Sequence, residues 1–222
     1  MHAQRSKIET LNIFFDLDGP ILDVSERYFR VHQDIIERHG GKSMDKATYW
    51  QLKRDRQPLS ALLTMAGCSN IEEAYHAEWF RNIESLEYLR YDIVIPGARE
   101  QLDSLRQHHF LVLVTLRQRR DYLDIQLGQL DLGRFFSAVF STDPTAVEGW
   151  KAKRNLISES GFFSRDALIV GDTEIDVRAA KSLGLTTVAV LSGIRNRKRL
   201  AEEGADHIVR DINALWHMVS GD

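Results

Sequence analysis

The sequence is poor in cysteine and proline and has no long apolar run. A single cysteine, Cys68, among 222 residues excludes an internal disulfide and a cysteine-rich zinc site, and it fits a protein of the reducing cytosol. The longest uninterrupted apolar stretch, residues 110–114, is far shorter than the ~20 residues that a membrane-spanning helix requires. The polar first ten residues show no secretory signal. We therefore expect a cytoplasmic protein with no membrane partner.

Neither sign of charge dominates the composition. The chain carries 29 lysine and arginine residues against 32 aspartate and glutamate residues, a formal net charge of −3 with neutral histidine. Nucleic acids and anionic membrane surfaces both attract a basic excess, so neither is expected as a partner. With 43% hydrophobic residues, the chain can bury the core of one domain, with or without a sizeable insertion. The sequence does not distinguish a monomer from a homodimer.

Short apolar runs bounded by polar turns predict buried β-strands. Most are nearly continuous in valine, isoleucine, leucine or phenylalanine, as expected where helices cover both faces of a parallel sheet. Between the later runs, Ala98, Leu102 and Leu105 have helical spacing, so strands and helices alternate. This pattern predicts an α/β fold with a doubly wound parallel sheet. The predicted strands are residues 11–15, 110–114, 138–140, 167–170 and 187–191.

One long interval, residues 25–90, shows helical signals and no convincing strand. Ser25 is a candidate cap for its first helix, and the spacing Ser69-x-x-Glu72 matches a capping box for a later one. We interpret the interval as a helical unit inserted into the α/β domain. The predicted division is an α/β core of residues 1–22 and 92–222 with an inserted helical domain of residues 23–91.

Acidic residues follow two of the predicted strands. The first strand runs directly into Asp16 and Asp18, and because residues i and i+2 of a strand point the same way, both carboxylates can address one bound group. Asp172 and Asp176 follow the strand at residues 167–170. Clustered carboxylates repel one another unless a cation neutralises them, and an all-oxygen site with few carboxylates suits Mg²⁺. The alternative for the first pair is an acidic surface turn, and for the second it is ordinary helix capping.

A hydroxyl and a lysine complete the set of candidate site residues. Thr115 ends the strand at residues 110–114, where it would face the same crevice as the carboxylates. Lys151, near the start of a predicted helix, could supply the positive charge that balances a phosphate. Lys153 is its rival, and because two residues correspond to about 200° of helix, only one of them can point inward. We favour Lys151 because it lies nearer the start of the helix.

These elements, in this order, resemble the motifs of the haloacid dehalogenase-like superfamily, in particular its phosphoglycolate phosphatase-like subgroup with an α-helical cap. The resemblance spans residues 16–176, and the helical interval is similar to a cap inserted after the first motif. The matching residues are Asp16 and Asp18 for the first motif, Thr115 for the second, Lys151 for the third, and Asp172 with Asp176 for the fourth.

The resemblance implies a phosphomonoester hydrolase that acts on a small phosphorylated metabolite. Asp16 would attack phosphorus and carry an aspartyl-phosphate. Asp18 would protonate the leaving alcohol and then accept a proton from the water that hydrolyses the intermediate. Thr115 and Lys151 would hold the phosphoryl oxygens.

The implied cofactor is Mg²⁺. It would be held by the carboxylates of Asp16 and Asp172 and by the main-chain carbonyl of Asp18. Asp176 would complete the metal site by orienting Lys151 or a metal-bound water.

Two departures from the family pattern bear on the substrate. Pro20 stands where the family often has threonine, and Leu116 follows Thr115 where asparagine or glycine is frequent. Neither departure touches the nucleophile, the acid or the metal site. The competing interpretations are a phosphomutase that returns the phosphoryl group to a sugar, and a binding module that keeps the fold without turnover.

Two basic segments are interpreted as surface features. Residues 53–56 lie in the helical interval, where a solvated face is favoured over contact with an anionic substrate. Arg117, Arg119 and Arg120 follow Thr115, and surface salt bridges are favoured over a role in the site.

Overall fold

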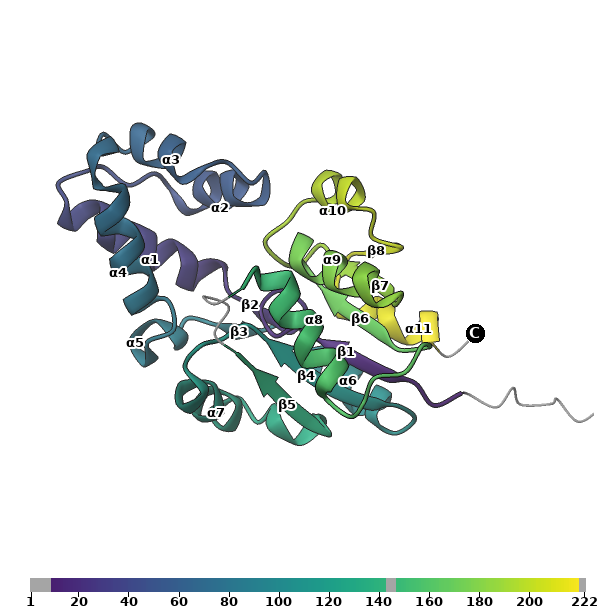
Figure 1. The fold of residues 1–222 in the computed structure, drawn as a ribbon. Helices are drawn as coiled ribbons and strands as arrows, with labels where there is room; N and C mark the ends of the chain where they lie inside the picture. The colour runs from purple at the N-terminus through teal and green to yellow at the C-terminus, as the bar shows by residue number, and fades with distance from the viewer. Residues whose placement is uncertain (1–8, 143–146, 220–222) are drawn as a thin grey trace, which may run out of the picture.

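In the computed structural model, which describes residues 9–142 and 147–219, six parallel strands form the central sheet (Figure 1). The strand order is β5-β4-β1-β6-β7-β8, so the chain winds outward from β1 in both directions. This confirms the predicted doubly wound α/β fold. A short sixth strand, β8, was not predicted. The strands are β1 (Asn12–Phe15), β4 (Phe110–Thr115), β5 (Ala138–Ser141), β6 (Leu168–Gly171), β7 (Thr186–Val190) and β8 (His207–Val209).

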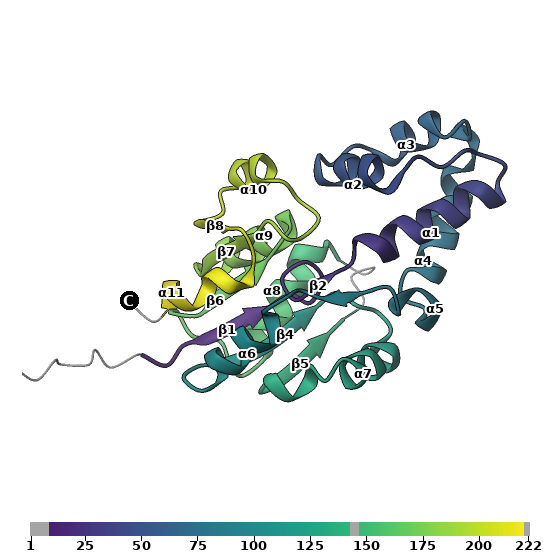
Figure 2. The same cartoon turned by 180° about the vertical axis from the view of Figure 1, so that it is seen from behind.

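Helices cover both faces of the sheet because its strands are apolar on both sides. Figure 2 shows helices on both sides of the strands. Ile13 and Phe15 of β1 pack against one set of helices, and Phe14, which points the opposite way, packs against the other. The first set is α6 (Ala98–Arg106), α7 (Arg120–Gln129) and α11 (Leu215–Val219), with the short turns η2 (Gly133–Phe135) and η4 (Ile212–Ala214). The second is α8 (Gly149–Glu159) and α9 (Glu174–Leu183), with α10 (Arg197–Glu203) beside α9. In the described part of the chain, no helix is both long and apolar enough to span a membrane.

The remaining helices form a separate layer, which we call the helical layer (Figure 1). It is joined to the sheet domain by a two-stranded antiparallel ribbon, β2 (Leu22–Asp23) with β3 (Ile93–Val94). Val31, Ile35, Leu63 and Tyr75 belong to its own apolar core. The layer consists of α1 (Ser25–Arg38), α2 (Lys46–Arg54), α3 (Leu59–Met65), η1 (Ser69–Ile71), α4 (Glu72–Asn82) and α5 (Leu86–Leu89).

Both predicted caps in this layer were wrong. Ser25 is already inside α1, and its N–H donates to the carboxylate of Asp23 at 2.9 Å. Ser69 begins the 3₁₀ turn η1, and α4 starts after Ile71 with no side-chain cap. In each case a serine stands close to the start of the helix, but the N-cap position is occupied by another residue, Val24 for α1 and Ile71 for α4.

Candidate active site

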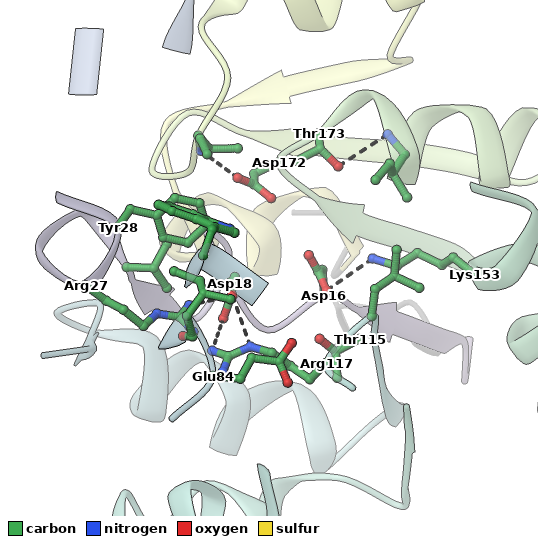
Figure 3. Close-up of a pocket in the computed structure, with 16 residues that line it drawn as sticks. Asp16, Asp18, Arg27, Tyr28, Glu84, Thr115, Arg117, Lys153, Asp172 and Thr173 are labelled. Carbon is green, nitrogen blue, oxygen red and sulfur yellow. Dashed lines mark hydrogen bonds and ion pairs between the residues drawn. The ribbon is translucent and has the colours of Figure 1, made fainter. Parts of the chain in front are cut away.

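Three strands that are neighbours in the sheet end in the polar residues singled out by the sequence. Asp16 follows β1, Thr115 ends β4 and Asp172 follows β6 (Figure 3). Because β1 pairs with both β4 and β6 in parallel, these carboxyl ends meet at one edge. The Asp16 N–H donates to the carbonyl of Val170 at 2.9 Å, which extends the pairing up to the nucleophile candidate.

The turn after Asp18 depends on glycine. Gly19 has φ +98°, a conformation that residues with a Cβ rarely adopt. A Cβ at this position would also overlap the carboxyl group of Asp172. Gly19 therefore lets the turn after Asp18 approach Asp172 closely.

Lys153, not Lys151, reaches the carboxylates, so the predicted placement of the lysine was wrong. The Lys153 side chain is 3% exposed, and its Nζ lies 3.1 Å from Asp16 Oδ1. Lys151 is 46% exposed and pairs with Glu148 at 2.7 Å on the outer face of α8. The physical reason is the apolar face of the helix, because Lys153 lies four residues before the buried Ile157 and shares its inward direction.

Asp176 holds Lys153 in position. Its Oδ1 accepts from Lys153 Nζ at 2.5 Å. Its Oδ2 accepts from the Thr173 hydroxyl at 2.7 Å and from the N–H groups of Thr173 and Asp172 at 3.0 and 3.2 Å. Both carboxylate oxygens of Asp176 therefore already accept hydrogen bonds, so we infer that Asp176 positions Lys153 and does not bind a metal directly.

The carboxylates of Asp16, Asp172 and Asp176 form one cluster, with ligand atoms within 4.8 Å of one another. Burial raises the pKa of Asp16 to about 7; Lys153 opposes this rise, whereas Asp176 and Asp18 add to it. Burial also raises the pKa of Asp172 well above its usual range, reinforced by Asp176 and Asp16. Burial would lower the pKa of Lys153, but the neighbouring Asp16 and Asp176 raise it above its usual range. A fully ionised cluster thus needs more positive charge than one lysine supplies.

Asp18 is held between two buried arginines. Arg117 Nη2 lies 2.6 Å from Asp18 Oδ1, and Arg27 Nη2 lies 2.6 Å from Asp18 Oδ2 (Figure 3). Burial would raise the pKa of Asp18, but the two guanidinium groups hold that pKa well below its usual range. Its side chain points to these arginines and does not join the cluster of Asp16, Asp172 and Asp176.

Asp92 contacts both arginines, so that Asp18, Arg27, Arg117 and Asp92 form a network of four charged side chains. The sequence analysis did not predict this network. Asp92 Oδ1 lies 2.9 Å from Arg27 Nε, and Asp92 Oδ2 lies 3.3 Å from Arg117 Nη2 and accepts from Gln126 at 2.8 Å. Asp18 precedes the helical layer in the chain, Arg27 belongs to α1, and Asp92 follows the layer. The network therefore joins both connections between the helical layer and the sheet.

Replacing Arg27 with methionine is expected to lower the free energy of unfolding by roughly 3–5 kcal/mol, because the buried Asp92 and the half-buried Asp18 would then share one guanidinium group. Urea denaturation measures this loss. Arg30→Met is the matched control, since Arg30 is also on α1 but pairs with Glu26 at the exposed surface, where about 0–1 kcal/mol is expected. Losses of equal size in the two variants would contradict the importance of the network.

A cavity of about 200 Å³ lies between the carboxylates and the helical layer. Its polar lining includes Asp16, Thr115 and Lys153, and its apolar lining includes Tyr28 and Trp79. The organic part of a molecule held at Asp16 would therefore contact side chains of the helical layer.

Contacts from two parts of the helical layer, the segment after α4 and the end of α2, fasten it over this cavity. Glu84, after α4, accepts from the N–H groups of Gln118 and Arg119, each at 2.9 Å. Arg54, at the end of α2, donates to the carbonyls of Leu191 at 3.0 Å and Gly193 at 2.5 Å. The prediction of a solvated face at residues 53–56 was therefore wrong, because this segment docks against the sheet domain.

The arginines after Thr115 divide into two groups. Arg119 and Arg120 pair with Asp121 and Asp124 at the surface, as predicted. Arg117 is buried in the site instead. Its position two residues beyond the strand that carries Thr115 is the signal that could have distinguished it.

Comparisons with known proteins agree with this geometry. The family model described as haloacid dehalogenase-like hydrolase matches residues 13–190. A phosphoglycolate phosphatase from Pseudomonas syringae pv. tomato is 30% identical over 215 residues, covering 91% of this chain and 77% of that protein. The chain therefore belongs to this family.

Two solved structures share the fold over nearly the whole chain. A haloacid dehalogenase-like family hydrolase from Streptococcus pneumoniae has a TM-score of 0.77 at 18% identity, covering 94% of this chain and 98% of that one. The hydrolase YfnB from Bacillus subtilis, in a structure bound to magnesium, has a TM-score of 0.69 at 21% identity, covering 95% and 99%. These two structures show the fold alone, whereas the family model and the Pseudomonas relative confirm the resemblance found in the sequence: the protein is a haloacid dehalogenase-like hydrolase, within the phosphoglycolate phosphatase-like subgroup of phosphatases.

Proposed function

We propose that this phosphatase is a Mg²⁺-dependent phosphomonoester hydrolase that works through an aspartyl-phosphate on Asp16. The observation that carries the proposal is the position of Asp16 at a cavity, 3.1 Å from the buried Lys153 and clustered with Asp172. This arrangement offers a carboxylate nucleophile beside a cation that can offset phosphoryl charge. Small phosphorylated metabolites fit the modest size of the cavity.

In the proposed reaction, an oxygen of the Asp16 carboxylate bonds to phosphorus as the bond from phosphorus to the ester oxygen breaks. Lys153 and Thr115 hold the phosphoryl oxygens, while Asp176 fixes the ammonium group of Lys153. A water molecule then attacks the phosphorus of the aspartyl-phosphate, which releases inorganic phosphate and restores the Asp16 carboxylate. Two displacements at phosphorus thus regenerate the enzyme.

Asp18 is proposed as the acid and base of these two steps. In the structure it is held as a carboxylate by Arg27 and Arg117, which is the form that accepts a proton from the attacking water. Before it can protonate a leaving alcohol, it must take up a proton and loosen an arginine contact. Because Arg27 lies on α1, a movement of the helical layer would change how tightly Asp18 is held.

The donor set fits a divalent metal. Three carboxylates against one lysine leave two negative charges when all are ionised, which a divalent cation balances. Asp16 and Asp172 would hold the ion, because both oxygens of Asp176 are engaged by the chain itself. All-oxygen ligation by few carboxylates is the preference of Mg²⁺, which when bound would neutralise charge on the transferred phosphoryl group.

We also propose that the helical layer serves as a cap, residues 23–91, over a core of residues 1–22 and 92–222. The contacts of Arg54 and Glu84 across the cavity support this division. A cap in this position would exclude bulk water from the reaction and would contact the organic part of the substrate.

Release of inorganic phosphate from 4-nitrophenyl phosphate and from a panel of phosphorylated metabolites tests the function. A hydrolase releases one phosphate for each substrate consumed. A phosphomutase would instead convert a sugar phosphate to its isomer with little free phosphate, and a binding module would do neither. Either of those outcomes would overturn the proposal.

Metal removal is expected to abolish turnover. Excess chelator should stop phosphate release, and added Mg²⁺ should restore it, because the uncompensated carboxylates would repel a phosphate dianion. Ca²⁺ should restore much less, since its larger and more flexible coordination misplaces the nucleophile. The measurement is phosphate release against free metal concentration, and full activity in excess chelator would refute the metal requirement.

A further inference from the structure

One peptide group connects the helical layer to the carboxylates of the site. It joins Gly193 to Ile194 in the loop of residues 191–196, which follows β7 and which we call the β7 loop. The carbonyl of Gly193 accepts a hydrogen bond from Arg54 Nη1 at 2.5 Å. The N–H of Ile194, at the other end of the same peptide group, donates to Asp172 Oδ2 at 2.6 Å. Arg54 of α2 is therefore linked to Asp172 through two hydrogen bonds.

The contact between the β7 loop and Asp172 leaves no room for a side chain. A Cβ at Gly193 would overlap Asp172 Oδ2, and the hydroxyl of Ser192 donates to the carbonyl of Gly19 at 2.7 Å. The Asp172 carboxylate thus lies between the β7 loop and the turn after Asp18. In the part of the chain that the structure describes, the other oxygen of Asp172, Oδ1, accepts no hydrogen bond. The loop therefore fixes one oxygen of Asp172 and leaves the other for a metal.

Arg54 orients this peptide group from the side of the helical layer. Its Nη1 also donates to the carbonyl of Leu191 at 3.0 Å, so two carbonyls of the β7 loop point at one guanidinium group. The N–H of Asn196 donates in turn to the carbonyl of Arg54 at 3.3 Å. A positive charge at a peptide carbonyl polarises the peptide group and strengthens its N–H as a donor. Arg54 therefore fixes the direction of the Ile194 N–H and strengthens its bond to Asp172.

Building on the proposed Mg²⁺ site, we propose that Arg54 is a positioning residue for the metal ligand Asp172. Arg54 is not among the residues that line the cavity containing Asp16, so it acts through the peptide group and not by contact with the substrate. Groups that hydrogen-bond to a metal ligand set its orientation and contribute about 10- to 100-fold to metal affinity. The helical layer thus helps to build the metal site as well as covering the cavity. Mg²⁺ binding and docking of the layer then favour each other.

Replacing Arg54 with methionine tests this role. In the substrate-free protein, Arg54→Met is expected to weaken Mg²⁺ binding by about tenfold or more, the scale of losing a group that orients a metal ligand. Isothermal titration calorimetry at a fixed pH measures this affinity. The direction of the change separates positioning from charge, because the loss of a nearby cation would by itself tighten the binding of Mg²⁺. In turnover of 4-nitrophenyl phosphate, the Mg²⁺ concentration that gives the half-maximal rate should rise, while kcat at saturating Mg²⁺ should change little.

Two further variants assign the effect to the peptide group. Arg199→Met is the matched control, because Arg199 of α10 donates to the carbonyl of Asp55 at 3.1 Å, across the same interface, and not to the carbonyl of Gly193. It should keep the wild-type affinity for Mg²⁺. Gly193→Ala disturbs the other end of the link, since the added Cβ would overlap the Asp172 carboxylate. It should weaken Mg²⁺ binding without removing any charge.

Three results would overturn the inference. The first is an affinity for Mg²⁺ in Arg54→Met that equals or exceeds that of the wild type, even if the variant unfolds at a lower temperature. The second is an equal loss of affinity in Arg199→Met, which would assign the effect to docking in general. The third is wild-type affinity in Gly193→Ala, a variant that leaves Arg54 in place. A wild-type protein that binds no Mg²⁺ would refute the proposed metal site together with the inference, whereas Mg²⁺ binding that is unaffected by Arg54→Met would refute the inference alone.

Discussion

Replacing Asp16 with asparagine is expected to abolish phosphate release from every substrate, by roughly 10⁴-fold or more, the scale of losing a covalent nucleophile. The amide keeps the shape of the side chain but is a poor nucleophile, so no aspartyl-phosphate can form. The variant should be inactive even toward 4-nitrophenyl phosphate, whose leaving group needs no proton. Acid-quenched wild-type enzyme should carry phosphate on Asp16 during turnover, and the variant should carry none.

Asp23→Asn is the matched control for this variant. Asp23 belongs to the same segment, is exposed, and accepts only the N–H of Ser25 among its described contacts. It should keep nearly full activity. Substantial turnover by Asp16→Asn, or phosphate trapped on another residue, would place the nucleophile elsewhere.

The sheet could be predicted because buried parallel strands are continuous apolar runs. Residues 110–114 and 167–170 are two such runs, and each was correctly predicted as a strand. An acidic residue that directly follows a run of this kind is expected at the carboxyl end of the strand. β8 was missed because it has only three residues, none of them fully buried, and its pairing with β7 is set by the fold. The candidate carboxylates were therefore found through the strands that precede them.

The choice between Lys151 and Lys153 depends on how α8 packs against the sheet, and not on how close each lysine is to the start of the helix. Distance from the start of the helix favoured Lys151, but which side of α8 faces the sheet is decided by Ala152 and Ile157. The sequence contained this signal, since Lys153 precedes Ile157 by one helical turn. An inward-facing lysine on an apolar face is unusual, and it is stabilised here by the carboxylates of Asp16, directly after β1, and Asp176 in α9.

The network around Asp18 could not be predicted from any local pattern. Arg27 and Asp92 are 65 positions apart in the sequence, and only the folding of the helical layer back onto the sheet brings them within 2.9 Å. Arg117 joins them from the loop after β4. Because these charged residues lie in three distant segments, no regular spacing in the sequence indicates that they are in contact. This part of the site could be identified only from the three-dimensional structure.

Replacing Lys153 with methionine is expected to lower kcat/KM for 4-nitrophenyl phosphate by roughly 10²–10³-fold, the usual cost of one preorganised charge that stabilises a transition state. Methionine keeps much of the volume of the buried side chain while removing its charge. Lys151→Met is the matched control, because Lys151 lies two residues away on the same helix and forms an exposed ion pair with Glu148. Its activity should stay within about twofold of the wild type, as expected for an exposed ion pair. An equal or larger loss in Lys151→Met would restore the original assignment.

Binding measurements can separate an electrostatic role of Lys153 from a merely structural one, because the two ligands of the site have opposite charges. The substitution removes the ammonium group that pairs with Asp16 and Asp176 in this cluster, so at a pH near 8 the variant should bind Mg²⁺ more tightly than the wild type. Inorganic phosphate, an anion, should bind more weakly to the same variant. Thermal unfolding followed against each ligand reports both affinities, since a ligand that binds only the folded state stabilises it. A distorted site would lose both ligands together, and that result would refute the charge-balancing role assigned to Lys153.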